Sequence, residues 1–118
     1  MNLDKYTENA KKVFFDAMET AQALKNQALT AGHLVKTILS QDNNRLAKEI
    51  KSCEGNLSGL LRELDKVIQI IPKVEGHKSL YVDKDLQIAM VEADRLSKKY
   101  GDKYIGINAL VIAIALGK

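Results

Sequence analysis

The chain repeats a helical pattern over a long distance, and this internal repeat limits what the chain can fold into. The pattern Ala-Met-x-x-Ala-x-x-Leu begins at Ala17 and again at Ala89, an offset of 72 positions. Residues 29–35 then match residues 105–111 at an offset of 76. We therefore expect four additional residues in the interhelix turn of the second copy. Duplicated supersecondary units usually bury their apolar faces against each other.

Length and composition indicate one globular domain. The 118 residues are 46% hydrophobic and 28% charged, which is ordinary for a soluble domain with its own core. The single cysteine, Cys53, allows no internal disulfide and favours a reducing compartment. No signal peptide is visible, and the longest apolar run, residues 109–116, is far below the ~20 residues that span a bilayer. We expect a cytoplasmic protein with no membrane partner.

The charge pattern argues against a nucleic-acid partner. The chain has 18 basic and 15 acidic residues, interspersed, for a net charge of +3. Nucleic-acid binding requires basic residues concentrated on one face. The balanced pattern predicts a solvated surface.

The first part of the chain predicts four helices. Thr7 is placed to cap the first helix, which extends to about Lys25, and Thr30 is placed to cap the second. A short third helix ends near Gly55. A fourth carries apolar residues at helical spacing and stops at Pro72, because proline disfavours helical geometry in the residue before it.

The second part predicts two more helices. Asp83 caps the first of them, and Gly101 stands where a left-handed helix end is expected. Asn108 opens the last helix, which is apolar all round and should therefore be buried on every side. No stretch alternates with a period of two for long enough to predict a strand. The predicted fold class is all-α.

These elements divide one domain, residues 1–118, into two pseudo-repeats of short helices. The first repeat covers residues 1–72, a linker covers 73–82, and the second repeat covers 83–118. The first repeat has four predicted helices and the second only two, so we expect the second to be incomplete. An apolar strip on the last helix would then be exposed, and such strips favour self-association.

No motif predicts catalysis or a cofactor. Gly101 and Gly106 have the opening spacing of a phosphate-binding loop, but Ile107 and Asn108 follow where Lys and Ser/Thr are required. The side chains of Cys53, His33 and His77 are isolated in the sequence, without the paired spacing of zinc sites. His33 is expected to pack or to cap a helix. We predict that this chain is not an enzyme.

Some apolar residues lie off the predicted core faces. Ile88 and Val91 are away from the apolar face of their helix, and Leu80 and Tyr81 end the linker. Two interpretations remain open: further helices cover these side chains, or they form an exposed apolar groove for another polypeptide.

The motifs together resemble the N-terminal domain of the Clp family of AAA+ unfoldases. The residues that carry the resemblance are Leu3-Asp4-Lys5-Tyr6-Thr7, Ala17 with Ala21, His33-Leu34, and Gly101-Asp102-x-Tyr104-Ile105-Gly106. Within the family, Ile71-Pro72-Lys73-Val74-Glu75-Gly76 is similar to the linker of ClpB, the disaggregating chaperone. The resemblance covers essentially the whole chain and implies a pseudo-twofold pair of helical repeats.

The resemblance implies a chaperone role. Such a domain captures exposed hydrophobic segments of misfolded or aggregated proteins for a hexameric, ATP-driven machine, whose ATP- and Mg-binding modules lie in other domains. The implied partners are unfolded polypeptides, the rest of the hexameric chain and, through other domains, the DnaK system. By position, the implied client-binding residues are Thr7, Met90, Leu96, Asp102, Asn108 and Ala109. Asn108 stands where the family usually has Glu, and Ala109 replaces a larger residue.

A second function from the same family stays open. ClpA- and ClpC-like unfoldases use this domain to dock a folded adaptor and supply a protease. The linker residues favour the ClpB-like function. Comparing capture of a denatured client with capture of folded adaptors distinguishes the two.

Overall fold

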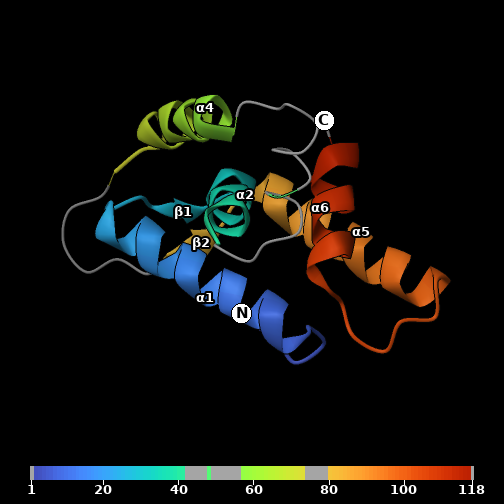
Figure 1. Cartoon of the computed structure of the whole chain (residues 1–118). Coiled ribbons are helices and arrows are strands. Elements are labelled where there is room, and N and C mark those ends of the chain that lie inside the picture. Colours follow the sequence, from blue (N-terminus) through green and yellow to red (C-terminus); the bar gives the residue numbers. More distant parts are fainter. Residues whose placement is uncertain (1, 42–47, 49–56, 74–79, 118) are drawn as a thin grey trace.

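The computed structural model describes residues 2–41, 48, 57–73 and 80–117, and it is mostly helical (Figure 1). The elements are α1 (Glu8–Ala23), β1 (Ala28–Leu29), α2 (Ala31–Ser40), α4 (Leu57–Gln69), β2 (Tyr81–Val82), α5 (Lys84–Lys99) and α6 (Ile107–Leu116). The helical fold class is confirmed, with two very short parallel strands added to it. The predicted third helix, Cys53 and His77 lie outside the described residues, as does most of the linker.

Three predicted helix starts are confirmed. The hydroxyl of Thr7 accepts a hydrogen bond from the backbone N–H of Ala10, and the side chain of Asp83 accepts one from Leu86. Thr30 caps α2 in the same way. Each cap satisfies an amide that the helix itself leaves without a partner.

The helix ends differ from the sequence prediction in detail. Helix α1 ends at Ala23, before Lys25, and α4 ends at Gln69, three residues before Pro72. Gly101 has φ +75°, the left-handed geometry expected for it. The prediction that Asn108 opens the last helix is wrong. Helix α6 begins at Ile107, and its N-cap is Gly106, which makes no side-chain cap.

The two repeats align at one offset, 76, throughout. The caps Thr7 and Asp83 begin helices of 16 residues each, and seven residues then separate α1 from α2 and α5 from α6. The offset of 72 predicted for the first helices is therefore wrong by four residues, as is the longer turn. Alanines recur four positions apart on the buried face of α1, at Ala17 and Ala21, so a shift of about one helical turn preserves the apparent match.

Backbone pairing links each repeat to the other. Leu29 in the first repeat pairs in parallel with Val82, directly before the second repeat, and Ile105 in the second repeat forms a parallel bridge with Tyr6 in the first. The matching hydrogen bonds run from Asp83 N to Leu29 O (3.0 Å) and from Thr7 N to Ile105 O (2.9 Å). The repeats are therefore interlocked around a pseudo-twofold axis.

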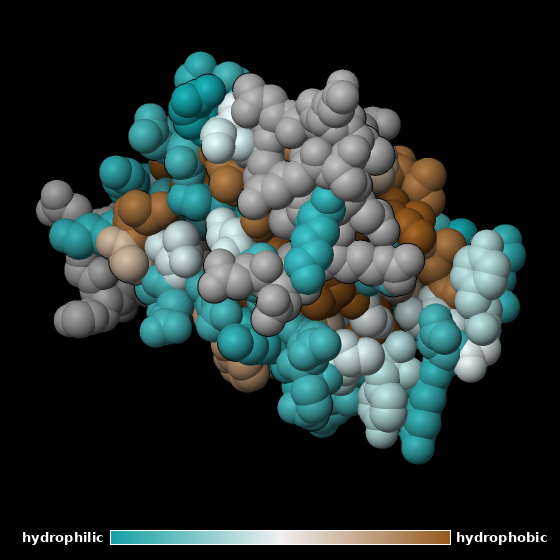
Figure 2. Space-filling model, in the orientation of Figure 1, coloured by the Kyte–Doolittle hydropathy of each residue, from teal (hydrophilic) through white to brown (hydrophobic). Residues whose placement is uncertain are grey.

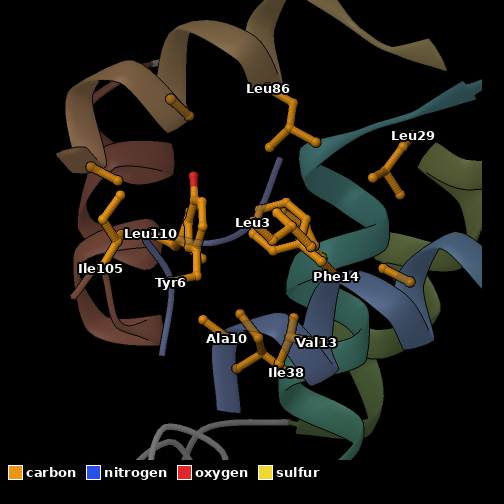
Figure 3. Packing of buried hydrophobic residues seen from close by; sticks show 14 of the residues in the cluster. Leu3, Tyr6, Ala10, Val13, Phe14, Leu29, Ile38, Leu86, Ile105 and Leu110 are labelled. Atoms are coloured by element: carbon orange, nitrogen blue, oxygen red, sulfur yellow. The ribbon is translucent and has the colours of Figure 1, made fainter. Parts of the chain in front are cut away.

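One core spans both repeats. Figure 3 shows Leu3, Tyr6 and Phe14 at its centre, between Leu110 and Ile105 on one side and Leu29 on the other. The rings of Tyr6 and Phe14 meet edge to face with centroids 5.1 Å apart. Burial, with a smaller effect of Asp94, raises the pKa of Tyr6 to about 12, so its phenol stays neutral.

The predicted apolar faces do not extend to the helix ends. The helical spacing of apolar residues in the sequence continues to Leu24 and Tyr100, but both side chains are exposed. Each residue is the C-cap of its helix, so its side chain has already left the helical stripe. Helix α6 is not buried on every side: Leu110 is fully buried, whereas Ile112 and Leu116 are 50% and 65% exposed.

The equivalent turns after α1 and α5 differ at one strained position. Lys25 has φ 59°, where its repeat equivalent is Gly101. A left-handed conformation costs a residue with a Cβ about 1 kcal/mol. We therefore expect Lys25→Gly to raise the free energy of unfolding by up to about 1 kcal/mol, and Gly101→Lys to lower it similarly. Urea unfolding of both variants measures this, and an unchanged Gly101→Lys variant would contradict it.

Candidate functional site

Four of the six residues that the resemblance implicates lie around the start of α6. The pairing of Lys5–Thr7 with Ile105 places Thr7, at the start of α1, beside Gly106. A Cβ on Gly106 would lie 3.8 Å from the methyl group of Thr7. Asn108 and Ala109 occupy the first turn of α6, and Asp102 lies in the loop that leads to it. The tertiary structure therefore brings the start of the chain to residues about 100 positions away.

The polar residues of this group differ in their environment. Thr7 is half-buried and its hydroxyl is used by the α1 cap. Asp102 and Asn108 are exposed, and within the described ranges neither side chain makes a hydrogen bond or an ion pair. The backbone N–H of Asp102 donates to Ser97 O (2.8 Å), which holds the loop against the end of α5. Asp102 and Asn108 are therefore available to a partner.

The three apolar residues among the six implied client-binding residues are too buried to form a preformed groove. Met90, Leu96 and Ala109 are all half-buried and pack against the core. Met90 and Leu96 are six positions apart on α5, which places them about 120° apart around its axis. They therefore do not form one continuous wall.

Thr7→Ala tests whether Thr7 acts through structure or through direct contact. Loss of the cap should lower the free energy of unfolding by about 1 kcal/mol. Asp83→Ala is the matched control, because it removes the equivalent cap of α5. Circular dichroism melting should show similar losses for the two variants. If Thr7→Ala alone impairs polypeptide binding, at equal stability, Thr7 contacts the partner directly.

The sequence predicts only a packing or capping role for His33, and in the structure His33 caps α2 within a buried polar cluster. The Nδ1 atom of His33 accepts a hydrogen bond from Thr30 N (3.0 Å), while Thr30 Oγ1 accepts one from His33 N, completing a capping box. With Nδ1 accepting, Nε2 carries the proton and donates to Asn26 Oδ1 (3.0 Å). The amide of Asn26 in turn donates to Ile71 O (3.5 Å). The cluster joins the α1–α2 turn to the segment after α4.

Protonation of His33 would disturb this cluster. Burial lowers the pKa of His33; Lys36 lowers it further, and Asp83 acts in the opposite direction. A proton on Nδ1 would also face the N–H of Thr30, so two donors would oppose each other. The folded protein therefore binds this proton less readily than the unfolded chain does.

We expect the domain to lose stability as the pH falls below about 6.5, the ordinary pKa of histidine in the unfolded chain. Above that pH both states are neutral at His33 and its contribution is complete. Urea unfolding at pH 7.5 and pH 5 measures the loss, with His33→Gln as the comparison. An equal loss in His33→Gln would assign the effect to other groups.

Large exposed apolar side chains occur on both repeats, from Phe15 and Ile70 in the first to Val91 and Leu116 in the second. Figure 2 shows hydrophobic atoms gathered at the right of the molecule, where α6 lies in Figure 1. Ile88 and Val91 are both exposed on α5, as either interpretation requires, so the choice between further helices and a groove stays open. Tyr81 is exposed as well, whereas Leu80 packs against the core.

The described residues contain no metal-binding or membrane-spanning feature. Among them, no group of three His, Cys, Asp or Glu side chains could hold a metal ion. None of the helices described is long and apolar enough to cross a bilayer.

The sequence model of the Clp repeat (R) N-terminal domain family matches residues 5–118. The chain belongs to this family. It is 29% identical over 119 residues to the chaperone protein ClpB of Mesorhizobium japonicum, covering 100% of this chain and 14% of that protein. It is 30% identical over 115 residues to ClpB of Gloeobacter violaceus, covering 97% of this chain and 13% of that protein. The chain therefore spans only about a seventh of the length of these chaperones.

Solved Clp N-terminal domains share the fold. The Hsp104 N-terminal domain from Candida albicans has a TM-score of 0.83 at 17% identity, covering 94% of this chain and 73% of that one. The ClpV1 N-terminal domain from Escherichia coli has a TM-score of 0.84 at 14% identity, covering 95% and 68%. At these identities the likeness supports the architecture alone.

Proposed function

We propose that this chain is the polypeptide-capturing N-terminal domain of a ClpB-like protein disaggregase. The match of the whole chain to the N-terminal part of ClpB chaperones carries the proposal. Support from the structure is the group of unpaired polar and exposed apolar side chains near the start of α6, namely Asp102, Asn108 and Ile112. Such a surface suits an extended apolar-rich segment with some polar groups.

Capture by one such domain should be weak. Burial of apolar area stabilises a complex by about 25 cal/mol per Å², and most of this is offset by the ordering of a flexible client. A hexameric ring would present six copies, so several weak contacts would combine into effective retention. The ATPase activity would belong to other parts of the assembly.

Titration with an unfolded client tests the proposal. Isotope-labelled chain titrated with α-casein should show saturable NMR shifts around Thr7, Asp102 and Asn108. Because the contacts are largely hydrophobic, the affinity should change little between low and high salt. Asp102→Ala and Asn108→Ala should weaken binding, whereas Glu19→Ala, on the exposed side of α1, should not.

Two further measurements test the proposal against nucleotide binding and against adaptor docking. ATP titrated by calorimetry should show no binding, because the loop from Gly101 to Gly106 lacks the lysine and hydroxyl of a phosphate-binding motif. Capture of a folded adaptor, without capture of α-casein, would favour the adaptor-docking function instead.

A further inference from the structure

The outer faces of α1 and α5 carry exposed apolar side chains at equivalent positions. Phe15 on α1 is 57% exposed, and its equivalent at the offset of 76, Val91 on α5, is 73% exposed. Phe15 stays exposed although α4 is in place in its repeat, because α4 packs on α2, to which the Lys36–Asp65 ion pair joins it. A helix packed on α6 as α4 packs on α2 would therefore leave Val91 exposed as well.

Each of these outer faces is a stripe with the spacing of a coiled-coil seam, in which successive positions are four, three and four residues apart. The acidic stripe on α1 consists of Glu8, Lys12, Phe15 and Glu19, and the basic stripe on α5 consists of their equivalents Lys84, Ile88, Val91 and Arg95. All of these residues are exposed. Side chains at this spacing lie along one side of a helix and can interdigitate with those of a second helix.

The two stripes have opposite charges at their ends. The acidic stripe begins and ends with carboxylates, at Glu8 and Glu19. The basic stripe begins and ends with cations, at Lys84 and Arg95. Charges beside an apolar seam determine which helices pair and in which orientation. The acidic stripe is therefore complementary to the basic stripe, whereas two copies of either stripe would repel each other.

We propose that the acidic stripe of one copy of this chain docks antiparallel on the basic stripe of a second copy. Within the described ranges neither Glu19 nor Lys84 makes an ion pair, whereas Arg95 is already paired with Glu92. The antiparallel alignment places Glu19 opposite Lys84 and so joins the two unpaired charges. A parallel alignment would instead place Glu19 opposite the occupied Arg95.

The centre of the contact is apolar. The same alignment places Phe15 against Ile88 and lays the aliphatic part of the Lys12 side chain over Val91. Only one helix of each copy takes part, so the association should be weak. Each copy carries both stripes, so the contact can continue from copy to copy around a ring or along a filament. The inference does not rest on the proposed function, because none of the six implied client-binding residues belongs to either stripe.

Sedimentation velocity of the intact chain over a series of concentrations tests the contact. We expect reversible association that added salt weakens, because the paired charges stay accessible to solvent. Ile88→Lys should weaken the association about tenfold, the effect of one lost contact at the centre of an interface. Ile112→Lys is the matched control, because Ile112 is similarly exposed but lies on α6, and it should leave the association unchanged.

A charge exchange tests the alignment. Glu19→Lys and Lys84→Glu should each weaken self-association about fivefold, because like charges then face each other between identical copies. An equimolar mixture of the two variants should associate as the unchanged chain does, since opposite charges face each other again between unlike copies. Circular dichroism melting should be unchanged in both variants, because both side chains are exposed.

Three results would overturn the inference. One is a chain that stays monomeric at millimolar concentration, which would leave the proposed function standing if α-casein still binds. Another is association that Ile112→Lys abolishes and Ile88→Lys does not, which would assign the contact to α6. A third is recovery of Glu19→Lys association in a mixture with Arg95→Glu but not with Lys84→Glu, which would replace the antiparallel alignment by a parallel one.

Discussion

Phe14→Ala should lower the free energy of unfolding by about 3–5 kcal/mol, enough to unfold much of a domain of ordinary stability. Phe14 is fully buried at the centre of the core that both repeats share, and its ring packs edge to face with that of Tyr6. Truncation removes the largest of the fully buried side chains described and leaves a cavity that rigid neighbours cannot fill.

The adjacent residue supplies the control. Phe15 is 57% exposed, so Phe15→Ala should change the free energy of unfolding by less than about 1 kcal/mol. Urea unfolding followed by circular dichroism compares the two. Similar losses for both variants would mean that α1 is rotated relative to the structure described.

Leu110→Ala should lower the free energy of unfolding by about 2–5 kcal/mol while leaving a single unfolding transition. Leu110 is fully buried and belongs to the same cluster as Phe14, although the two lie in different repeats. Since the repeats are also joined by reciprocal backbone pairing, neither should unfold alone.

Ile112→Ala is the matched comparison on the same helix. Its side chain is half exposed, so the loss should be below about 1 kcal/mol. Calorimetry with a second probe, such as NMR signals from each repeat, follows both variants. Two separate transitions in Leu110→Ala would show that the second repeat is an independent unit.

The junction between the two repeats passes through the candidate site at Thr7. Thr7 both caps α1 and donates its N–H to Ile105, so a substitution there affects the junction of the two repeats as well as any bound polypeptide. A loss of chaperone activity in a Thr7 variant therefore needs the Asp83 control before it is assigned to client contact. The side chains of Asp102 and Asn108 make no hydrogen bond or ion pair within the described ranges, so a loss of binding in their variants points to client contact.

The candidate site was predictable in part. Resemblance placed Thr7, Asp102, Asn108 and Ala109 in one functional group, and the structure gathers them around the start of α6. The same resemblance grouped Met90 with Leu96, which face different directions on α5. The exposed face of Ile112 and Leu116 was foreseen only as an unspecified apolar strip, because periodicity in a helix that is apolar all round cannot distinguish its sides.

The sequence by itself determined the five helices that the structure describes, the N-caps at Thr7, Thr30 and Asp83, and the family. These features depend on residues a few positions apart, so local hydrogen bonding and periodicity are sufficient to predict them. Tertiary structure decided that the repeats align at an offset of 76 and that α6 is exposed on one side. It also decided the backbone pairing of Tyr6 with Ile105 and of Leu29 with Val82. Those features depend on contacts between distant segments, whose free energy no local pattern of residues contains.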